Sequence, residues 1–508
     1  MLNMNNNAHR LKREILVRLT KIQLEGKLDE AVDNIPKEFA PLGSASIRCC
    51  IYHDREIIRQ RVIARLGWSL EDYDDNKRIS EYAKEALARE KPIWPIHTVI
   101  DEACNACVRS HYMVTNVCQA CLARPCMTNC GKKAIEIKDG RSWIDSDKCV
   151  SCGLCLQNCP YKAIIKIPVP CEEACPVGAI TKNENGKERI DYQKCIACGN
   201  CMRECPFGAL VDKSQLFDVV KHIMAGKKIA ALYAPAVAAQ FRVESGQLEG
   251  ALLACGFSNV VEVALGADIT ADREAEEFEE RINQGDKMMT TSCCPAYVRA
   301  VRLHVPQLAD CISTTRTPMH YAAEIAKKEF PGCLTVFIGP CLAKRQEGMD
   351  DDLVDYVISI EEIGSLFVAK NIDVAKAASA PGKQLPTSSG RNFAKSGGVA
   401  QAVKARLKNS ALLKEAIVDG LDKAGMKRLT ELGKIVTGEL PYTADTPNLI
   451  EVMSCQGGCI SGPLVVTNPK VALMQLGKYS SAGQYSSAGQ YSSAGQCAEK
   501  GAPISPQS

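Results

Sequence analysis

The segment Glu451-Val-Met-Ser-Cys-Gln-Gly-Gly-Cys459 organises the second half of the 508-residue chain. Its first three residues end an apolar run, Asn448–Met453, that reads as a short buried strand, and Cys455 and Cys459 follow this run. The Gly-Gly pair between these cysteines allows the backbone to come close to a bulky group. The pattern indicates a strand end that holds a ligand with two cysteines.

Two other apolar runs end in the same way. Lys287–Thr291 leads into the adjacent cysteines Cys293 and Cys294, and Leu334–Ile338 leads into Cys341. Ligands of open α/β sheets bind beyond the carboxyl ends of the strands. We therefore expect three cysteine motifs to meet at one site.

The surrounding sequence has the alternation of an α/β domain. The runs Lys228–Tyr233 and Val260–Ala264 read as further buried strands, and Arg273–Asn283 and Tyr321–Lys328 have helical apolar spacing. Such alternation predicts mostly parallel sheets. We assign residues 213–470 to this α/β domain.

The overall composition narrows the class of protein. A length of 508 residues allows two or three domains, and a net charge of +3 gives no electrostatic reason to expect nucleic-acid or membrane binding. No apolar run approaches the roughly 18 residues of a membrane-spanning helix, and the N-terminus lacks the apolar core of a signal peptide. These features predict a cytoplasmic protein, in which many of the 27 cysteines are metal ligands rather than members of disulfides.

The spacing of the cysteines between residues 101 and 212 predicts iron–sulfur clusters. Cys149–Pro160 and Cys195–Pro206 both read Cys-x2-Cys-x2-Cys-x3-Cys-Pro, the run that bacterial ferredoxins wrap around a [4Fe-4S] cluster. Cys118–Cys130 is a variant run, and Cys171–Cys175 and Cys104–Cys107 are half-motifs. A structural zinc site is the alternative that this spacing disfavours.

The number of these cysteines matches four [4Fe-4S] clusters. Two hairpin-like linkers, Lys133–Cys149 and Ala179–Cys195, predict two ferredoxin-like α+β modules. Together they suggest the four sets, of which the last is left by elimination: Cys118, Cys121, Cys126 and Cys159; Cys130, Cys149, Cys152 and Cys155; Cys175, Cys195, Cys198 and Cys201; Cys104, Cys107, Cys171 and Cys205.

The two ends of the chain carry less information. Residues 1–100 have helical apolar spacing and predict a small helical region of unknown role. Its adjacent pair Cys49-Cys50 reads as ordinary thiols, with a redox or ligand role as the alternative. Residues 471–508 contain three copies of Tyr-Ser-Ser-Ala-Gly-Gln and are expected to form a disordered tail.

Three features at the strand ends indicate a role beyond electron storage in one cluster. Cys293 is a fifth cysteine beside four candidate ligands, Lys344 is a cation within one helical turn of Cys341, and Glu347 follows one turn later. A plain [4Fe-4S] cluster requires none of them.

The motifs Thr291-Ser-Cys-Cys-Pro295, Gly339-Pro-Cys-Leu-Ala-Lys-Arg-Gln-Glu347 and Glu451–Cys459 resemble the three signature motifs of the [FeFe]-hydrogenases, in the same order. The resemblance covers about residues 215–470 and the ferredoxin-type relay before them. That family carries an H-cluster, a [4Fe-4S] cubane joined through one cysteine to a diiron unit with CO, cyanide and azadithiolate ligands. The resemblance implies cubane ligands at Cys294, Cys341, Cys455 and Cys459, the last bridging to the diiron unit.

The resemblance also implies which residues surround the diiron unit. Lys344 would donate a hydrogen bond to a cyanide ligand, Met453 would pack near the bridge, and Ser292 would lie beside the cluster. Ala234-Pro235 resembles the loop that borders the diiron pocket.

The resemblance implies a proton relay that starts at Cys293. Glu347, Ser313 and Glu277 are the candidates for its next steps, and Glu274 is as arguable as Glu277. The alternative for either helix glutamate is a solvated helix face.

The motifs depart from the best-studied branch of the family at several places. Gly339 stands where Met is usual, Met319 where Gln is frequent, Tyr297 where Trp is usual and Ala236 where Ser is common, and the third motif continues to Pro463 without its further glycines. Such neighbours tune a metal site. The departures leave catalytic bias and oxygen tolerance open and remove no candidate ligand.

The resemblance predicts an enzyme that interconverts protons, electrons and H2. The expected partners are a ferredoxin or a similar soluble carrier and the maturation proteins that build the diiron unit. Two alternatives remain: a non-catalytic iron–sulfur scaffold without the diiron unit, and a sensory hydrogenase. Cys293, Lys344 and Glu347 disfavour the scaffold.

Overall fold

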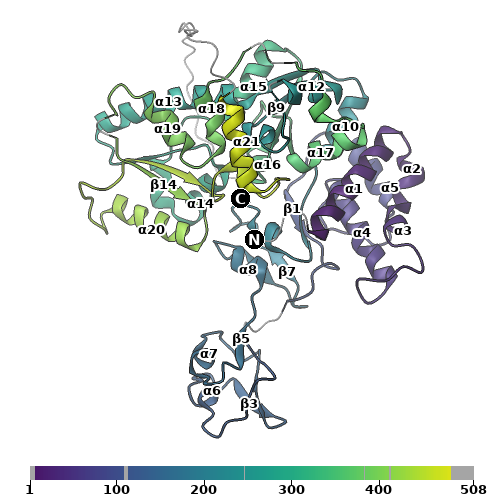
Figure 1. Cartoon of the computed structure of the whole chain (residues 1–508), viewed down its shortest axis with the longest axis vertical. Helices are drawn as coiled ribbons and strands as arrows, with labels where there is room; N and C mark the ends of the chain where they lie inside the picture. Colours follow the sequence, from purple (N-terminus) through teal and green to yellow (C-terminus); the bar gives the residue numbers. More distant parts are fainter. Residues whose placement is uncertain are drawn as a thin grey trace.

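The computed structural model describes residues 6–107, 112–244, 246–380, 382, 384–410 and 413–481. An α/β body forms the upper part of Figure 1, with a bundle of N-terminal helices packed at one side. Below the body lies the cysteine-rich region, whose outer module projects away from the rest of the molecule. This region thus extends from the α/β body to an exposed module.

The N-terminal helices form a small core of their own. Apolar side chains such as Ile15, Val62 and Tyr82 are buried between them. Trp68 donates its indole N–H to the carbonyl of Tyr82 and closes the bundle. The helices are α1 (Asn7–Leu24), α2 (Leu28–Ala31), η1 (Val32–Asn34), α3 (Ile35–Phe39), α4 (Ile51–Arg65) and α5 (Ile79–Ala88).

A buried ion cluster fastens these helices to the rest of the chain. Asp212, fully buried, accepts from Lys12 (2.8 Å), Arg65 (3.0 Å) and Arg345 (2.9 Å). The three cations hold the pKa of Asp212 well below its ordinary value despite its burial. Arg345 also pairs with Glu362. The cluster thus joins the N-terminal bundle, the cysteine-rich region and the α/β body.

The cysteine-rich region consists of two modules made of short strands and single-turn helices. The outer one contains β2 (Tyr112–Val114) paired with β5 (Ile164–Lys166), β3 (Ile135–Lys138) paired with β4 (Arg141–Ile144), α6 (Pro125–Thr128) and α7 (Leu154–Asn158). The inner one contains β1 (His97–Val99) paired with β8 (Leu210–Asp212), β6 (Ile180–Lys182) paired with β7 (Glu188–Ile190), α8 (Pro170–Ala174) and α9 (Asn200–Glu204). All four pairs are antiparallel, and both predicted hairpins are present as β3–β4 and β6–β7.

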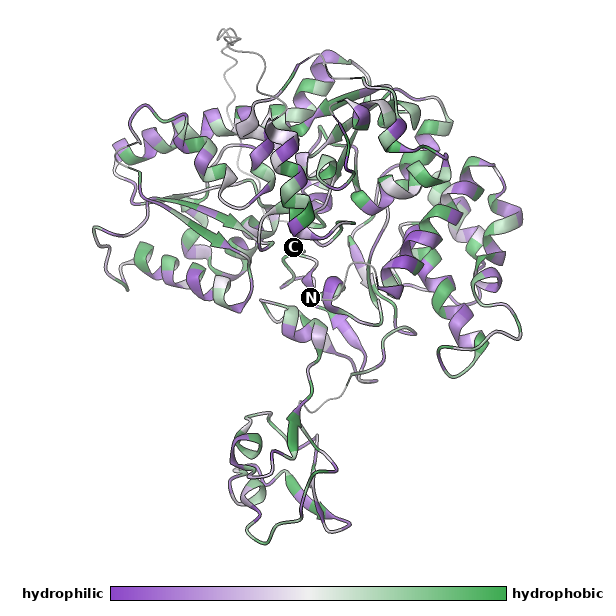
Figure 2. Ribbon diagram, in the orientation of Figure 1, coloured by the Kyte–Doolittle hydropathy of each residue, from purple (hydrophilic) through white to green (hydrophobic). Residues whose placement is uncertain are grey.

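The α/β body contains two parallel sheets, in keeping with the expected parallel sheets, and the strands that lead into the three cysteine motifs are divided between them. The first sheet has the order β10 (Asn259–Glu262), β9 (Ile229–Tyr233), β12 (Leu334–Gly339), β13 (Tyr356–Ser359). The second has the order β11 (Met289–Thr290), β15 (Leu449–Met453), β14 (Glu415–Asp419). Hydrophobic residues, green in Figure 2, concentrate on the strands, in keeping with buried parallel sheets.

Helices cover both sheets. They are α10 (Leu216–Met224), α11 (Pro235–Ala238), α12 (Gln247–Ala254), α13 (Val263–Gln284), α14 (Pro295–His304), η2 (Pro306–Cys311), α15 (Pro318–Glu329), α16 (Ala343–Met349), α17 (Ile360–Ala369), η3 (Val374–Lys376), α18 (Ser388–Arg391), η4 (Asn392–Ala394), α19 (Gly398–Lys404), α20 (Lys423–Thr437), η6 (Cys459–Ser461) and α21 (Pro469–Ser481). The start of α13 at Val263 shortens the predicted strand Val260–Ala264 by two residues.

Helix α21 corrects the predicted boundary of the tail. Ala472 and Leu476 pack against α11, and the hydroxyl of Tyr479, in the first repeat copy, lies 3.0 Å from that of Tyr233. These buried contacts make residues 469–481 part of the folded body, so the expectation of disorder from residue 471 is wrong up to residue 481. The remaining repeats, residues 482–508, lie outside the described residues.

Candidate active site

Three strand ends bring the five cysteines together. Strand β11 leads into Cys293 and Cys294, β12 into Cys341, and β15 into Cys455. Cys459 begins the short helix η6. Because β12 belongs to one sheet and the other two strands to the second, the cysteines lie where the carboxyl ends of two sheets meet.

Burial raises the pKa of all four candidate ligands. Burial raises the pKa of Cys341 to about 11 and of Cys459 to about 12, and neighbouring cysteines add to both shifts. Cys455, whose pKa is raised well above its ordinary value, is influenced by Cys341, Cys459 and Cys294. Four buried thiols this close cannot all ionise without a positive partner. Metal binding supplies that charge and deprotonates them, so the donor set suits a metal cluster.

The Gly-Gly pair of the third motif approaches the chain itself. A Cβ atom on Gly458 would lie 2.6 Å from the carbonyl carbon of Lys395 and from the amide nitrogen of Ser396, and its φ of +90° is also a glycine conformation. The expected close approach therefore serves to lay Cys459 against η4 and its following loop.

Several buried polar atoms around the cysteines have no partner within the described chain. They are the hydroxyl oxygens of Thr291, Ser396 and Ser454, together with Oε2 of Glu274. Buried groups of this kind are usually hydrogen-bonded. Hydroxyls adjoining Cys455 and Cys293 fit a bound group with polar ligands, as the H-cluster has.

Lys344 and Glu347 form a buried pair. Nζ of Lys344 donates to both carboxylate oxygens of Glu347 (2.9 and 2.7 Å) and to Oγ1 of Thr317 (3.1 Å). The pKa of Lys344 is raised, since the Glu347 charge outweighs burial. Glu347 therefore holds Lys344 in place, and its predicted role in the proton relay stays a prediction.

A row of polar groups extends from Ser292, the neighbour of Cys293, along helix α13. Glu274 is fully buried, and its Oε1 accepts from the amide (3.0 Å) and hydroxyl (3.3 Å) of Ser292, the neighbour of Cys293. Burial raises the pKa of Glu274 to about 7 and raises that of Cys293, which also senses the Glu274 charge. Ser313, which influences Glu274, donates to Oε2 of Glu277 at 2.6 Å.

Glu277 forms the outer end of this row. Its side chain is 14% exposed, and hydrogen bonds from Ser313, Thr314 and Thr315 lower its pKa against the effect of burial. Glu274 and Glu277 are three residues apart and share a helix face. The sequence left the two as equal candidates; the structure places both in one row, with Glu274 inside. The i,i+3 spacing was the signal that could have identified the pair.

The remaining predicted residues surround the cysteines. Met453 is buried with Phe393 beside Cys293 and Cys294. Ala234 and Pro235 begin α11, and this helix packs against the hydrophobic cluster that includes Cys459.

Two departures from the usual motifs have local packing reasons. Tyr297 is fully buried, and its hydroxyl donates to Oγ1 of Thr290 at 2.7 Å. A Cβ atom on Gly339 would lie 2.5 Å from the ring of Phe337. A larger residue at position 339 therefore requires Phe337 to move.

The structure assembles the relay cysteines in the predicted sets. Three cavities are each lined by four of them: Cys118, Cys121, Cys126 and Cys159; Cys130, Cys149, Cys152 and Cys155; Cys104, Cys107, Cys171 and Cys205. The members of the fourth set lie near one another: burial raises the pKa of Cys201 well above its ordinary value, followed by Cys198, Cys195 and Cys175 and then by Cys171 of the adjoining set.

Among the described residues, no group of three or more His, Cys, Asp or Glu is placed to hold one metal ion. The spacing of the cysteines, which is that of ferredoxin runs, remains the reason to disfavour the zinc alternative.

The inner module packs directly on the active site. Cys198 and Ala197 contact the cluster of side chains that includes Cys294, Cys341 and Leu342. Arg299 donates to the carbonyl of Cys195 at 2.6 Å. The set of Cys175, Cys195, Cys198 and Cys201 therefore adjoins the strand-end cysteines.

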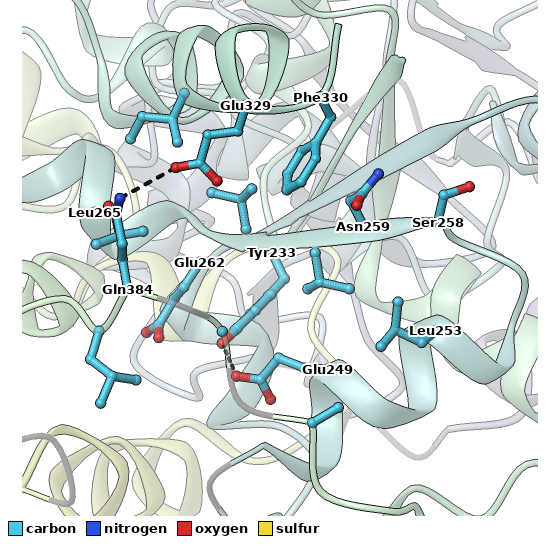
Figure 3. Close-up of a pocket in the computed structure, with 16 residues that line it drawn as sticks. Tyr233, Glu249, Leu253, Ser258, Asn259, Glu262, Leu265, Glu329, Phe330 and Gln384 are labelled. Carbon is cyan, nitrogen blue, oxygen red and sulfur yellow. Dashed lines mark hydrogen bonds between the residues drawn. The ribbon is translucent and has the colours of Figure 1, made fainter. Parts of the chain in front are cut away.

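A separate cavity of about 300 Å³ lies along strand β10, and none of its lining residues is a cysteine. Figure 3 shows its carboxylates paired: Glu249 accepts from Tyr233 (2.7 Å) and Glu329 from Gln384 (3.3 Å). Glu262 binds Arg391. Since the acidic side chains already have protein partners, we assign no ligand to this cavity.

Comparison with known proteins identifies two families. Residues 227–463 match the iron only hydrogenase large subunit, C-terminal domain, and residues 142–165 and 188–211 match the 4Fe-4S binding domain. The chain is 30% identical over 376 residues to the periplasmic [Fe] hydrogenase large subunit of Nitratidesulfovibrio vulgaris, covering 63% of this chain and 85% of the relative.

Two further relatives are matched over about half their length. Iron hydrogenase 1 of Clostridium pasteurianum is 27% identical (43% of this chain, 45% of the relative), and the NADP-reducing hydrogenase subunit HndD of Solidesulfovibrio fructosivorans is 29% identical (50% and 52%). A solved structure of [FeFe]-hydrogenase HydA1 from Chlamydomonas reinhardtii aligns at 20% identity with a TM-score of 0.42, over 51% of this chain and 88% of that one.

The location of the protein stays a prediction. No helix in the described ranges has the length and apolar character needed to cross a membrane. One relative is named periplasmic.

Proposed function

The chain belongs to the iron-only hydrogenase family, and from that premise we propose that it catalyses the reversible reaction 2H+ + 2e− ⇌ H2 at an H-cluster. The observation that carries the proposal is a fifth cysteine, Cys293, beside four candidate ligands, with polar groups next to it. Its neighbour Ser292 donates to the buried Glu274, and Ser313 donates to the more exposed Glu277. An electron-storing cluster has no use for such groups.

Four cysteines would hold the cubane: Cys294, Cys341, Cys455 and Cys459, with Cys459 joining it to the diiron unit. When bound, this cofactor supplies the metal centre at which protons and electrons combine. The unpartnered hydroxyls of Ser396 and Ser454 support the assignment, because they are buried beside these ligands.

Cys293 and Glu274 would carry protons between the cofactor and the exterior. A relay group works best when its pKa lies near the working pH, because it can then both accept and donate a proton. The pKa of Glu274, about 7, meets this condition, and its free Oε2 offers a position for the proton. Ser313 then connects Glu274 to Glu277.

Lys344 would provide a positive charge beside the cofactor. It is buried and oriented by Glu347 and Thr317. A charge-assisted hydrogen bond from Lys344 to an anionic ligand such as cyanide requires Nζ to exchange one of these partners.

The four relay sets would hold four [4Fe-4S] clusters, two in the projecting module and two in the inner one. Residues 112–168 of the outer module contain eight Lys and Arg against four Asp and Glu, so basic side chains predominate around the two clusters, whose own negative charge is not in this count. An acidic soluble carrier, a ferredoxin most simply, fits this charge. The maturation proteins that build the diiron unit are further expected partners.

H2 evolution from a reduced viologen tests this function, with protein that has received the diiron unit by co-expression of maturation proteins or from a synthetic complex. We expect turnover in both directions. Protein that takes up the unit but turns over only slowly would favour the sensor. Protein that binds only [4Fe-4S] clusters and shows no turnover would favour the scaffold.

A further inference from the structure

The loop before helix α4 presents two adjacent cysteines that the proposed function does not use. Cys49 and Cys50 are both exposed, and Cys50 is the N-cap residue of α4. The carboxylate of Asp54 accepts from the amides of Ile47 (2.8 Å) and Arg48 (3.2 Å) and so braces the loop. The cysteines are therefore held in place at the surface.

Cys49 belongs to a row of thiol, imidazole and carboxylate. Its Sγ lies 3.2 Å from Nδ1 of His53, and Nε2 of His53 lies 3.0 Å from a carboxylate oxygen of Glu102. A thiol with a base within hydrogen-bond reach, and a base oriented by a third group, is the arrangement of an activated nucleophile. The second sulfur, of Cys50, lies 3.9 Å from the first.

The two thiols differ in acidity. The backbone N–H of His53, in the first turn of α4, lowers the pKa of Cys50. Cys49 donates to Cys50, which raises the pKa of Cys49. One sulfur thus favours the thiolate while its neighbour keeps a proton. A low-pKa exposed thiol beside a second cysteine is the pattern of oxidation-sensitive pairs.

No other cysteines in the described ranges share this setting. Cys255, Cys311 and Cys333 are buried, and the remaining ones belong to the candidate cluster sites. A single-metal site is disfavoured, because no group of three or more ligands in the described part suits one ion.

We propose that Cys49 and Cys50 form a redox-active pair that a hydroperoxide converts to a disulfide. The Cys50 thiolate attacks the peroxide, the O–O bond breaks, and Cys50–S⁻ + ROOH + H+ gives Cys50–SOH + ROH. The Cys49 thiol then attacks the sulfenic acid, and Cys49–SH + HOS–Cys50 gives the disulfide and water. The two thiols lose two electrons in total, and the peroxide is reduced. His53, held by Glu102, faces the Cys49 proton that leaves.

The disulfide should be readily reversible. Neighbouring Cα atoms are about 3.8 Å apart across a trans peptide, less than the roughly 4.4–6.8 Å usual for disulfides. The ring is therefore strained and more easily reduced.

The pair is attached to the wall of a candidate cluster site. Arg48, next to Cys49, donates to the carbonyl of Ala103 (2.8 Å) and to Oδ1 of Asn105 (3.1 Å). Asn105 lines the cavity of Cys104, Cys107, Cys171 and Cys205. Closing the disulfide moves a loop that contacts the relay.

Mass spectrometry of the cluster-loaded protein tests the proposal. Anaerobic protein receives one equivalent of H2O2, is alkylated and digested, and its visible absorbance reports cluster integrity. We expect the Cys49–Cys50 peptide to lose two hydrogens before the absorbance falls, and dithiothreitol to restore both thiols. C49S should stop at a sulfenic acid on Cys50 that dimedone traps, C50S should block oxidation, and H53Q should slow it.

The exposed neighbour Tyr52 supplies a matched control, since Y52F leaves all four groups in place. Its peptide should oxidise at the rate of the unaltered protein. The proposal is overturned if both cysteines stay alkylatable while the clusters already bleach. It is equally overturned if C50S leaves the reactivity of Cys49 unchanged and no disulfide forms in the unaltered protein.

Discussion

Replacing Glu274 with Gln separates a proton relay from a structural role. Glu274 is fully buried, and its carboxyl has a pKa of about 7 against an ordinary 4.5. That difference costs the ionised form about 3 kcal/mol relative to the neutral one. Gln keeps the acceptor oxygen that Ser292 uses but carries no exchangeable acid proton.

The sign of the stability change follows from the raised pKa. Between about pH 4.5 and 7 the folded protein holds a proton that the unfolded chain has released, so stability falls as pH rises through this window. Gln does not titrate. E274Q should therefore match the unaltered protein at about pH 4 and gain up to about 3 kcal/mol relative to it near pH 8.

Activity should change in the opposite direction. Removing a positioned acid–base group typically costs about 10²- to 10⁴-fold in turnover, so E274Q should lose H2 evolution by at least about a hundredfold. The measurements are H2 evolution from reduced viologen and denaturant midpoints at both pH values. E276Q, an exposed neighbour on α13, is the control and should change neither. Near-normal turnover in E274Q would refute the assigned path.

Three further outcomes are expected. C293A should retain the infrared bands of the cofactor but lose at least about a hundredfold in turnover, because the first relay group is gone; normal H2 evolution would contradict this. R345M should lower the free energy of unfolding by about 3–5 kcal/mol, because it leaves the buried Glu362 without its cation and Asp212 with Lys12 and Arg65 alone, whereas an unchanged denaturant midpoint would contradict a structural role for the cluster. K132E, at the exposed cavity of the outer module, should raise the KM for an acidic ferredoxin without affecting viologen-driven turnover, and K37E on α3 is the control; equal KM values would exclude docking at this module.

Local spacing predicted much of the site. The cysteine sets followed from short spacers, because three ligands of one cubane lie within seven residues of chain. Strands β9, β12 and β15 were predictable because apolar runs of this length, bounded by turn residues, are typical of buried parallel strands.

Features that depend on contacts between distant residues could not be predicted from the sequence. The division into two sheets depends on the pairing of β11 with β15 across some 160 residues. The order of Glu274 and Glu277 was visible only once helix α13 was placed against Ser292 and Ser313. Asp212 pairs with cations from three helices, α1, α4 and α16, and no local sequence pattern indicates such an ion cluster. Composition alone placed Tyr479 in a disordered tail, whereas its ring is buried against Arg391.

An infrared spectrum tests the central proposal most directly. The protein would be prepared anaerobically with the diiron maturation machinery, and C459S under the same conditions is the matched control. Sharp CO and cyanide bands in the unaltered protein, lost or altered in C459S, are the predicted result. Absent bands, with iron that matches [4Fe-4S] clusters alone, would contradict an H-cluster at the strand-end cysteines.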